Sequence, residues 1–328
     1  MIIENDIYPG YIQITRRCNN NCIFCSNPKF EKDLDVDEIK DIIYNYKKSG
    51  KINQIIITGG EPTLHKNLTE VILFANSLGF DTKMMTNAIL LSDNEFVKKI
   101  KDAKLHHINI SIHTHRREDY KTLSNTDNIL QVLKGIHNCI LNDFEVNFNI
   151  TLNSINKDYL SKLIGFLIQN FPSVNHYVFN NLDIGFSDKK HQSMAGVNFS
   201  IIAKLSEIEL ELNKSLELLE QNNKTFRVER VPLCYMGRFK DCSTETRRIV
   251  KEQDYRCTFI QDKGKENILD LKINSFLSER KYKNNNCQKC SLYDICSGID
   301  IDYYNKFGDF ELSPVFEDKL KIIEKILK

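Results

Sequence analysis

Apolar and polar positions along the first half of the chain follow a repeating pattern of strands and helices. Residues 11–15 alternate like a short strand, and Leu34–Lys47 carries apolar side chains at helical spacing. The uncharged run Ile55–Ile57 is typical of a strand buried on both faces of a parallel sheet. Further helices are predicted near 67–77, 92–102, 127–141 and 156–169, and further strands near 81–86, 107–112, 145–151 and 174–179.

This series predicts the fold class. Six strand-and-helix units with short connections, within roughly 170 residues, indicate an α/β fold in which a parallel sheet curls into a partial TIM-like (β/α)6 barrel. From about residue 182 the pattern changes, and Ser200–Leu219 has the spacing of a long charged amphipathic helix. We expect the barrel at 1–182, a connecting loop and helix at 183–229, and a smaller cysteine-rich domain at 230–328.

Three local features are also predicted. Ser92 and Glu95 have the spacing of a capping box at the start of a helix. A hairpin turn is expected around residues 262–264. A closing helix is expected within 314–327, and its inner face would consist of Leu320, Ile323 and Ile326.

Composition narrows the class of protein. The 328 residues are 41% hydrophobic and 27% charged, which is ordinary for a folded protein. Basic residues number 45 and acidic residues 44, so the net charge of +1 gives no overall attraction to nucleic acid or an anionic membrane. The chain begins without a basic, apolar signal segment, and its ten cysteines are too few for a disulfide scaffold. A cytoplasmic protein with no membrane or nucleic-acid partner is therefore expected.

Three cysteines lie close together directly after the first predicted strand. Cys18, Cys22 and Cys25 fall within eight residues, so their thiolates can face one inorganic centre. A structural zinc site takes four ligands. Three thiolates on a four-iron cluster instead hold three irons and leave the fourth iron for an outside chelator.

A second motif, Thr58–Thr63, follows the Ile55–Ile57 strand. Its glycines, Gly59 and Gly60, allow a close approach of the backbone to a ligand. Glu61 offers a carboxylate to a cationic amine, and the proline that follows it stiffens the turn.

Together these motifs resemble a known family. The run from Cys18 through Phe24 to Cys25 resembles the signature of the radical S-adenosylmethionine (SAM) enzymes, and Gly59–Pro62 resembles the GGEP segment that takes the SAM amino group in that family. The resemblance covers about residues 8–180. It implies that a [4Fe–4S] cluster chelates SAM through its free iron, and that one electron cleaves SAM to methionine and a 5′-deoxyadenosyl radical, which abstracts hydrogen from a substrate.

The resemblance also implies further contacts with SAM. Phe24 and its loop would pack on the adenine. Polar residues at the ends of the third, fourth and fifth strands would meet the methionyl carboxylate, the ribose and nearby SAM atoms: Thr86, Asn87, Ser111, Asn149 and Thr151. His113 and His115 follow the fourth strand and could move a proton, although structural roles are more usual for such histidines.

A third constellation lies near the C-terminus. Cys287, Cys290 and Cys296 resemble the auxiliary-cluster region called SPASM, or its shorter twitch relative, with Asp300 where the full pattern has another cysteine. At least one auxiliary iron–sulfur cluster is expected, with a fourth ligand from Cys234, Cys242 or Cys257. Cys234 is favoured because a nearby proline fixes the approach of the chain. The alternatives are a zinc knuckle with one distant ligand, and two incomplete clusters, one of which includes Cys242 and Cys257.

In the family, auxiliary domains of this kind recur in enzymes that modify ribosomally made peptides or protein side chains. A peptide maturase is therefore predicted. The barrel begins within the first dozen residues, so the peptide would dock on the C-terminal part or through a separate recognition protein. A donor such as flavodoxin or ferredoxin would supply the electron. The alternatives are a small-molecule radical SAM dehydrogenase or synthase, and a non-catalytic iron–sulfur or zinc redox sensor. The GGEP turn disfavours the sensor, which needs no SAM amine site.

Overall fold

A computed structural model describes residues 8–26, 31–184, 197–260 and 268–328. Its main sheet contains nine strands in this described part of the chain, in the order β7-β6-β5-β4-β3-β2-β1-β8-β9. Neighbours from β7 through β8 pair in parallel, and β9 runs antiparallel to β8. The first seven strands are β1 (Tyr8–Thr15), β2 (Ile52–Gly59), β3 (Asp81–Thr86), β4 (His107–Ser111), β5 (Glu145–Leu152), β6 (His176–Asn181) and β7 (Thr225–Glu229).

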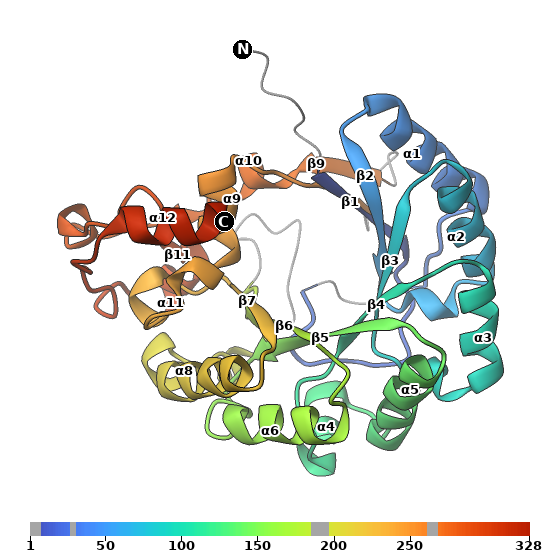
Figure 1. The fold of residues 1–328 in the computed structure, drawn as a ribbon, viewed down its shortest axis with the longest axis horizontal. Coiled ribbons are helices and arrows are strands. Elements are labelled where there is room, and N and C mark those ends of the chain that lie inside the picture. The colour runs from blue at the N-terminus through green and yellow to red at the C-terminus, as the bar shows by residue number, and fades with distance from the viewer. Residues whose placement is uncertain (1–7, 27–30, 185–196, 261–267) are drawn as a thin grey trace.

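Helices cover the outer side of this curved sheet, as Figure 1 shows. They are α1 (Val36–Ser49), α2 (Leu68–Ser77), α3 (Asn94–Asp102), α5 (Ile129–Leu141), α6 (Leu160–Asn170) and α8 (Leu205–Gln221). The predicted partial barrel is confirmed. A further short helix, α4 (Arg117–Ser124), follows β4 and was not expected from the apolar spacing.

The strands alternate between a buried outer face and a polar inner face. In β4, Ile108 and Ile110 are fully buried beneath the helices, whereas Asn109 and Ser111 alternate with them and face the interior of the barrel. Across the strand pair, Asn147 of β5 donates through Nδ2 to Asn109 Oδ1 at 3.0 Å. Because the inner face carries amides and hydroxyls, the barrel interior keeps room for polar ligands at its open end.

The C-terminal segments lie in the gap between β7 and β9 (Figure 1). Strands β8 and β9 extend the main sheet, and β10 pairs antiparallel with β11. The elements are α9 (Thr244–Lys251), β8 (Arg256–Ile260), β9 (Ile268–Lys272), α10 (Ile273–Ser278), β10 (Lys281–Tyr282), β11 (Ile299–Asp300), α11 (Ile301–Phe307) and α12 (Lys319–Leu327). β8 and β9 flank the hairpin turn expected at 262–264, which lies outside the described residues.

Two local predictions are corrected. Helix α3 is capped by Asp93, whose carboxylate accepts from Glu95 N at 3.0 Å, because Ser92 belongs to the preceding 3₁₀ turn. The inner face of α12 is formed by Ile322 and by the predicted Ile326, and the predicted Ile323 is partly buried against the same core. The helix begins later than expected, at Lys319, and Leu320 is 61% exposed because it lies two residues before Ile322, on nearly the opposite side of the helix.

The sheet continues past the expected limit of the barrel. β7 lies within 183–229 and pairs in parallel with β6, while β8, in the expected C-terminal domain, pairs with β1. The division at residues 182 and 230 stays a prediction, and the main sheet crosses both positions.

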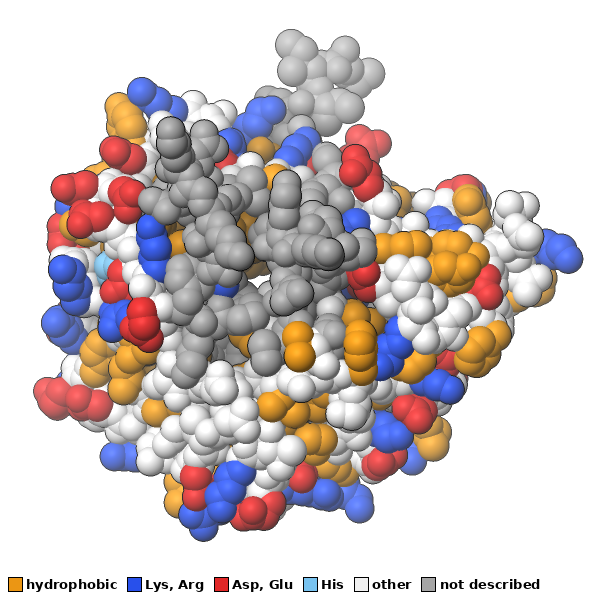
Figure 2. Space-filling view, turned by 180° about the vertical axis from the view of Figure 1, so that it is seen from behind, with side chains coloured by type: hydrophobic (Ala, Val, Ile, Leu, Met, Phe, Trp, Pro, Cys, Tyr) orange, Lys and Arg blue, Asp and Glu red, His pale blue; other side chains and the backbone are white. Residues whose placement is uncertain are grey.

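The described surface carries mixed charge. On the face seen in Figure 2, basic and acidic side chains are interspersed rather than separated by sign. None of the described helices is long and apolar enough to cross a membrane.

Candidate active site

A cavity of about 350 Å³ opens at the carboxyl ends of the parallel strands. Most of the residues predicted to hold the cluster and SAM line it together, and only Glu61 does not. The predicted residues in its lining are Cys18, Cys22, Phe24, Cys25, Gly59, Gly60, Thr86, Asn87, Ser111, Asn149 and Thr151.

The base of the cysteine loop is tied to its surroundings by Arg17. This guanidinium donates to both carboxylate oxygens of Asp33, at 2.9 and 2.6 Å, and to Leu64 O at 2.9 Å. Burial would raise the pKa of Asp33, but the hydrogen bonds from Arg17 and Thr15 outweigh burial and lower this pKa. The ion pair therefore persists at neutral pH and fixes where the loop leaves β1.

The two glycines of the second motif lie against the start of this loop. Gly60 N donates to Thr15 O, and Glu61 N donates to Arg17 O, both at 2.8 Å. A Cβ on Gly60 would lie 2.3 Å from Arg17 O, and one on Gly59, whose φ is +154°, would lie 2.3 Å from Thr15 O. The glycines are therefore required for the contact between the two loops, in addition to leaving room for a ligand.

The Glu61 side chain lies between this turn and the end of β3. Its Oε1 accepts from Thr63 N at 3.1 Å and from the hydroxyls of Thr63 and Thr86, both at 2.7 Å. Its Oε2 accepts from Asn87 N at 2.7 Å. The side chain is buried, which raises the pKa of its carboxyl group. Both oxygens are engaged inside the protein, so a direct contact of Glu61 with a ligand amine stays a prediction.

The predicted residues at the ends of β3, β4 and β5 form one side of the cavity. Thr86 donates to Glu61, and Asn87 Nδ2 lies 3.8 Å from Cys18 Sγ. Ser111 and Asn149 are register partners across β4 and β5, and the Asn149 amide also accepts from Asn180.

His113 has a fixed protonation state in this wall. Its Nδ1 accepts from Thr151 N at 3.0 Å, and its ring meets the Phe24 ring edge to face at 5.0 Å between centroids. Burial lowers the pKa of His113 to about 4, so the ring is neutral with its proton on Nε2. It is therefore a hydrogen-bond donor rather than a proton shuttle at neutral pH. His115 stacks on Phe166 of α6 at 4.7 Å.

Sequence reasoning missed several residues of the cavity. Its lining includes Asn20, Tyr120, Leu123, Ser124, Asn180, Asn181, Asp183 and Arg230. Asn180 and Asn181 end β6, so their position after a predicted strand was an available signal. Arg230 pairs with Asp183 at 3.3 Å and directly follows β7. The apolar pattern of the sequence did not predict this strand.

A second, smaller cavity brings four cysteines together. Cys234, Cys287, Cys290 and Cys296 all line it, whereas Cys242 and Cys257 do not. Two of these sulfurs accept backbone hydrogen bonds. Val315 N donates to Cys290 Sγ at 3.3 Å, and Gly298 N donates to Cys296 Sγ at 3.4 Å. Burial raises the pKa of Cys234 to about 12, so a thiolate there requires a cationic partner such as a metal centre.

Asp300 has a different role from a ligand. Its carboxylate pairs with Lys281 at 2.6 Å across the β10–β11 pair, and Lys281 and Arg230 together lower its pKa against the effect of burial. Where the SPASM pattern has a further cysteine, this chain therefore has a carboxylate. That carboxylate interacts electrostatically with Lys281 and with Arg230, and Arg230 lines the first cavity.

Comparison with known proteins decides the family. Residues 12–167 match the family model described as the radical SAM superfamily. This segment belongs to the radical SAM superfamily. The predicted resemblance is thereby confirmed, and with it the use of a [4Fe–4S] cluster and SAM as cofactors.

Curated relatives resemble about half of the chain. A "Probable GTP 3',8-cyclase" from Saccharolobus islandicus (strain Y.N.15.51) is 35% identical over 157 residues, 47% of this chain and 50% of the relative. Another from Pyrococcus abyssi is 31% identical over 159 residues, which is 47% of this chain and 51% of that protein. The chain thus spans about half the length of the curated relatives it matches.

Solved structures resemble almost the whole chain, including the C-terminal region. Streptococcus suis SuiB bound to precursor peptide SuiA matches with a TM-score of 0.65 at 16% identity, covering 96% of this chain and 75% of SuiB. The anSMEcpe structure with bound AdoMet and Kp18Cys peptide matches with a TM-score of 0.63 at 12% identity, covering 97% of this chain and 96% of anSMEcpe. At these identities the likeness concerns the fold.

The residues present fit the radical SAM cofactors. Three soft thiols lie on one loop at the edge of a polar cavity, as the three-thiolate ligation of a four-iron cluster requires. In the described part of the chain, no three Cys, His, Asp or Glu side chains converge as they would on a single metal ion. A cluster binds each thiolate through a different iron, so its ligands need not converge on one point. Gly59, Gly60 and Phe24 leave the adjoining space open for SAM.

Proposed function

We propose that the protein reductively cleaves SAM to methionine and a 5′-deoxyadenosyl radical, and abstracts a hydrogen atom from a side chain of a ribosomally made peptide or protein. The supporting observation is the single cavity that joins the cysteine loop to the polar residues after β6 and β7. The solved structures that share the fold over almost the whole chain include peptide complexes.

In this proposal, Cys18, Cys22 and Cys25 hold the catalytic cluster. When bound, the cluster and SAM supply the radical chemistry. The chain's own residues bind and orient SAM: Phe24 against the adenine, the Gly59–Glu61 turn near the amino group, and the strand ends Thr86, Asn87, Ser111, Asn149 and Thr151 around the carboxylate and ribose. Asp183 and Arg230 lie at the part of the lining contributed after β6 and β7, where the substrate would be held.

We further propose that Cys234, Cys287, Cys290 and Cys296 hold a SPASM-like or twitch-like auxiliary iron–sulfur cluster. Their common cavity supports this set, and it favours Cys234 as the fourth ligand over Cys242 and Cys257. The backbone donors to Cys290 and Cys296 suit cluster ligands, since hydrogen bonds to sulfur tune such centres.

A small-molecule substrate is the second candidate, because the curated relatives are named as GTP cyclases. A nucleoside triphosphate carries several negative charges, and its phosphates are usually held by several Arg or Lys side chains. Among the described residues of the cavity lining, Arg230 is the one basic side chain, and it is paired with Asp183. The charge of the cavity therefore favours the peptide.

An anaerobic assay with SAM and dithionite tests the proposal. We expect 5′-deoxyadenosine, and we expect its yield to rise with a short peptide encoded beside this gene but not with GTP. Mass spectrometry of the peptide would show the change. Stimulation by GTP alone would favour the small-molecule enzyme, and no 5′-deoxyadenosine under any condition would favour the redox sensor.

Changing Cys18, Cys22 and Cys25 together to alanine should abolish SAM cleavage and remove about four irons, while the auxiliary iron stays. Formation of 5′-deoxyadenosine by this triple variant would contradict the ligand assignment.

A cytoplasmic location, a flavodoxin or ferredoxin donor and a separate recognition protein stay predictions.

A further inference from the structure

The short helix α4 packs directly against the cysteine loop. Asn21 N donates to Ser124 O at 2.8 Å, and Ile23 N donates to Leu123 O at 3.0 Å. The Asn125 side chain adds a third bond through Nδ2 to Asn21 O, at 2.9 Å. The C-terminal end of α4 therefore holds the backbone between Cys18 and Cys25 at several points.

Four side chains extend this contact, and we call them the latch: Asn20, Tyr120, Ser124 and Thr126. Thr126 Oγ1 donates to Asn20 Oδ1 at 2.8 Å, and Asn20 Nδ2 donates to Tyr120 Oη at 3.3 Å. The Ser124 hydroxyl donates to Tyr120 O at 2.7 Å and lies 3.0 Å from Thr126 Oγ1. Asn20 is only 6% exposed, so its amide depends on these partners for its hydrogen bonds.

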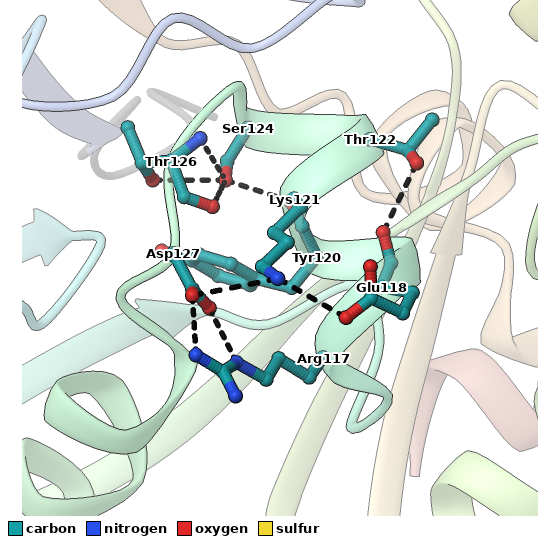
Figure 3. Close-up of polar contacts among 8 residues, drawn as sticks. All are labelled: Arg117, Glu118, Tyr120, Lys121, Thr122, Ser124, Thr126 and Asp127. Atoms are coloured by element: carbon teal, nitrogen blue, oxygen red, sulfur yellow. Dashed lines mark hydrogen bonds and ion pairs between the residues drawn. The ribbon is translucent and has the colours of Figure 1, made fainter.

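Ion pairs fix the turn that carries Thr126. Figure 3 shows Arg117 and Lys121 of α4 both reaching Asp127. Arg117 donates to the two carboxylate oxygens of Asp127 at 2.8 and 2.5 Å, and Lys121 Nζ lies 3.5 Å from Asp127 Oδ2. Exposed pairs contribute little energy singly, but the two-pronged geometry sets the position of the turn.

All three residues between the first two cysteines are anchored in this way. Asn19 Oδ1 accepts from Asn87 Nδ2 at 2.7 Å, Asn20 belongs to the latch, and Asn21 is bonded to Ser124 and Asn125. Asn19 is bonded to the residue after β3, whereas Asn20 and Asn21 are bonded to α4 and the turn after it. The separation of Cys18 from Cys22 is therefore set by the protein fold.

We propose that the latch positions the thiols of the catalytic cluster before iron is present and slows loss of the cluster afterwards. Its members are positioning residues, not ligands. Asn20, Tyr120 and Ser124 also line the cavity, so a displaced loop would change the wall around SAM as well. This inference rests on the proposed function, in which Cys18, Cys22 and Cys25 hold that cluster.

The test compares two variants, Thr126→Val and Thr122→Val. The first removes the Thr126 hydroxyl that donates to Asn20. Thr122 lies on α4, just before the turn that carries Thr126. It is exposed, and among the contacts described it donates only to Glu118 O within the helix, at 3.0 Å (Figure 3). Iron lost to a chelator is followed anaerobically after reconstitution, with the Cys18, Cys22 and Cys25 triple alanine variant as the baseline for auxiliary iron. We expect Thr126→Val to lose its catalytic iron roughly five- to tenfold faster than wild type, and Thr122→Val to match wild type.

Two further variants separate positioning from simple unfolding. Thr126→Ser keeps the hydroxyl and should restore the wild-type rate. Asn125→Gly removes the bond to Asn21 at a position whose φ is +53°, where glycine is tolerated, and should speed iron loss without lowering the melting temperature of the iron-free protein. The electron paramagnetic resonance change that SAM causes in the reduced cluster should weaken in Thr126→Val.

Equal iron loss from Thr126→Val and Thr122→Val would overturn the latch, as would failure of Asn125→Gly to speed iron loss. If the triple cysteine variant keeps the SAM-dependent resonance change, the assignment of the catalytic ligands is wrong instead. The two failures are therefore distinguishable in one set of proteins.

Discussion

Glu61 occupies a more enclosed position than its motif suggested. A carboxylate in this turn was expected to meet a cationic amine, yet its oxygens accept four bonds from Thr63, Thr86 and Asn87. Through these bonds Glu61 joins the turn after β2 to the end of β3, and both segments line the cavity. Its influence on SAM can therefore pass through the positions of Thr86 and Asn87.

Glu61→Gln tests this arrangement. The substitution replaces one carboxylate oxygen by an NH₂ group, which cannot accept the hydrogen bonds that Thr63, Thr86 and Asn87 donate. At least one of these donors therefore loses its acceptor, at a cost of about 1–3 kcal/mol. We expect a lower free energy of unfolding of the iron-free protein, measured in urea, together with weaker SAM binding to the reconstituted protein. Glu70→Gln is the control, since Glu70 lies in an exposed pair with Lys40 at 2.5 Å. Weaker SAM binding with unchanged unfolding would instead indicate direct contact with the SAM amine.

Among the structural elements, the turn after β2 and the loop after β1 depend on each other. Gly59 ends β2 and Gly60 follows it, close to where the sequence predicts the end of a strand, but the reason that they are glycines is the neighbouring backbone of Thr15 and Arg17. A carbonyl oxygen cannot move away from a new Cβ as the end of a flexible side chain can. The motif therefore couples the SAM-binding turn to the cysteine loop.

Gly60→Ala should disturb this coupling. The added Cβ would lie 2.3 Å from Arg17 O, and overpacking of this kind typically costs about 1–3 kcal/mol. We expect less iron after reconstitution and weaker SAM binding, measured by iron analysis and by calorimetry. Gly165→Ala in α6 is the matched control, because the nearest atom to its Cβ, Leu218 Cδ2, is 3.9 Å away. Equal behaviour of the two variants would show that the loops adjust independently.

Across the whole molecule, the cysteine-rich region is joined to the barrel by long-range contacts. Cys234 follows β7 of the main sheet, whereas Cys287, Cys290 and Cys296 lie more than fifty residues later in the sequence, and all four line one cavity. A metal centre held by these four thiolates would crosslink the end of the sheet to the C-terminal helices. Such binding energy is also folding energy.

Cys290→Ala should therefore lower the iron content and expose the C-terminal third to protease, while some uncoupled SAM cleavage persists at the catalytic cluster. Iron analysis and limited proteolysis provide the readouts. Cys234→Ala should behave in the same way, whereas Cys242→Ala and Cys257→Ala should keep full iron. Full iron in Cys290→Ala would remove the auxiliary cluster from the proposal, and full iron in Cys234→Ala would move the fourth ligand elsewhere.

Local patterns in the chain are sufficient for the order of strands and helices from β1 to β6, except for α4, and for the two N-terminal motifs. The alternation of β4 and β5 reveals which side chains face the barrel, because successive residues of a strand point to opposite faces. Likewise, Cys18, Cys22 and Cys25 must be neighbours, since they share one short loop. Helix α4 was missed because its eight residues carry few apolar side chains and its position depends on contacts with the cysteine loop.

Contacts between distant segments were decided by the tertiary structure. The bond of Thr126 to Asn20 joins residues 106 positions apart, and the pair of Asp183 with Arg230 forms because β7 adds to the sheet beside β6. The inward direction of Glu61 likewise depends on donors supplied by the next strand. Sequence periodicity records the faces of each element, but it carries no register between elements. The packing of strands and helices into the partial barrel sets that register, and it places the latch, the Asp183–Arg230 pair and the four-cysteine cavity.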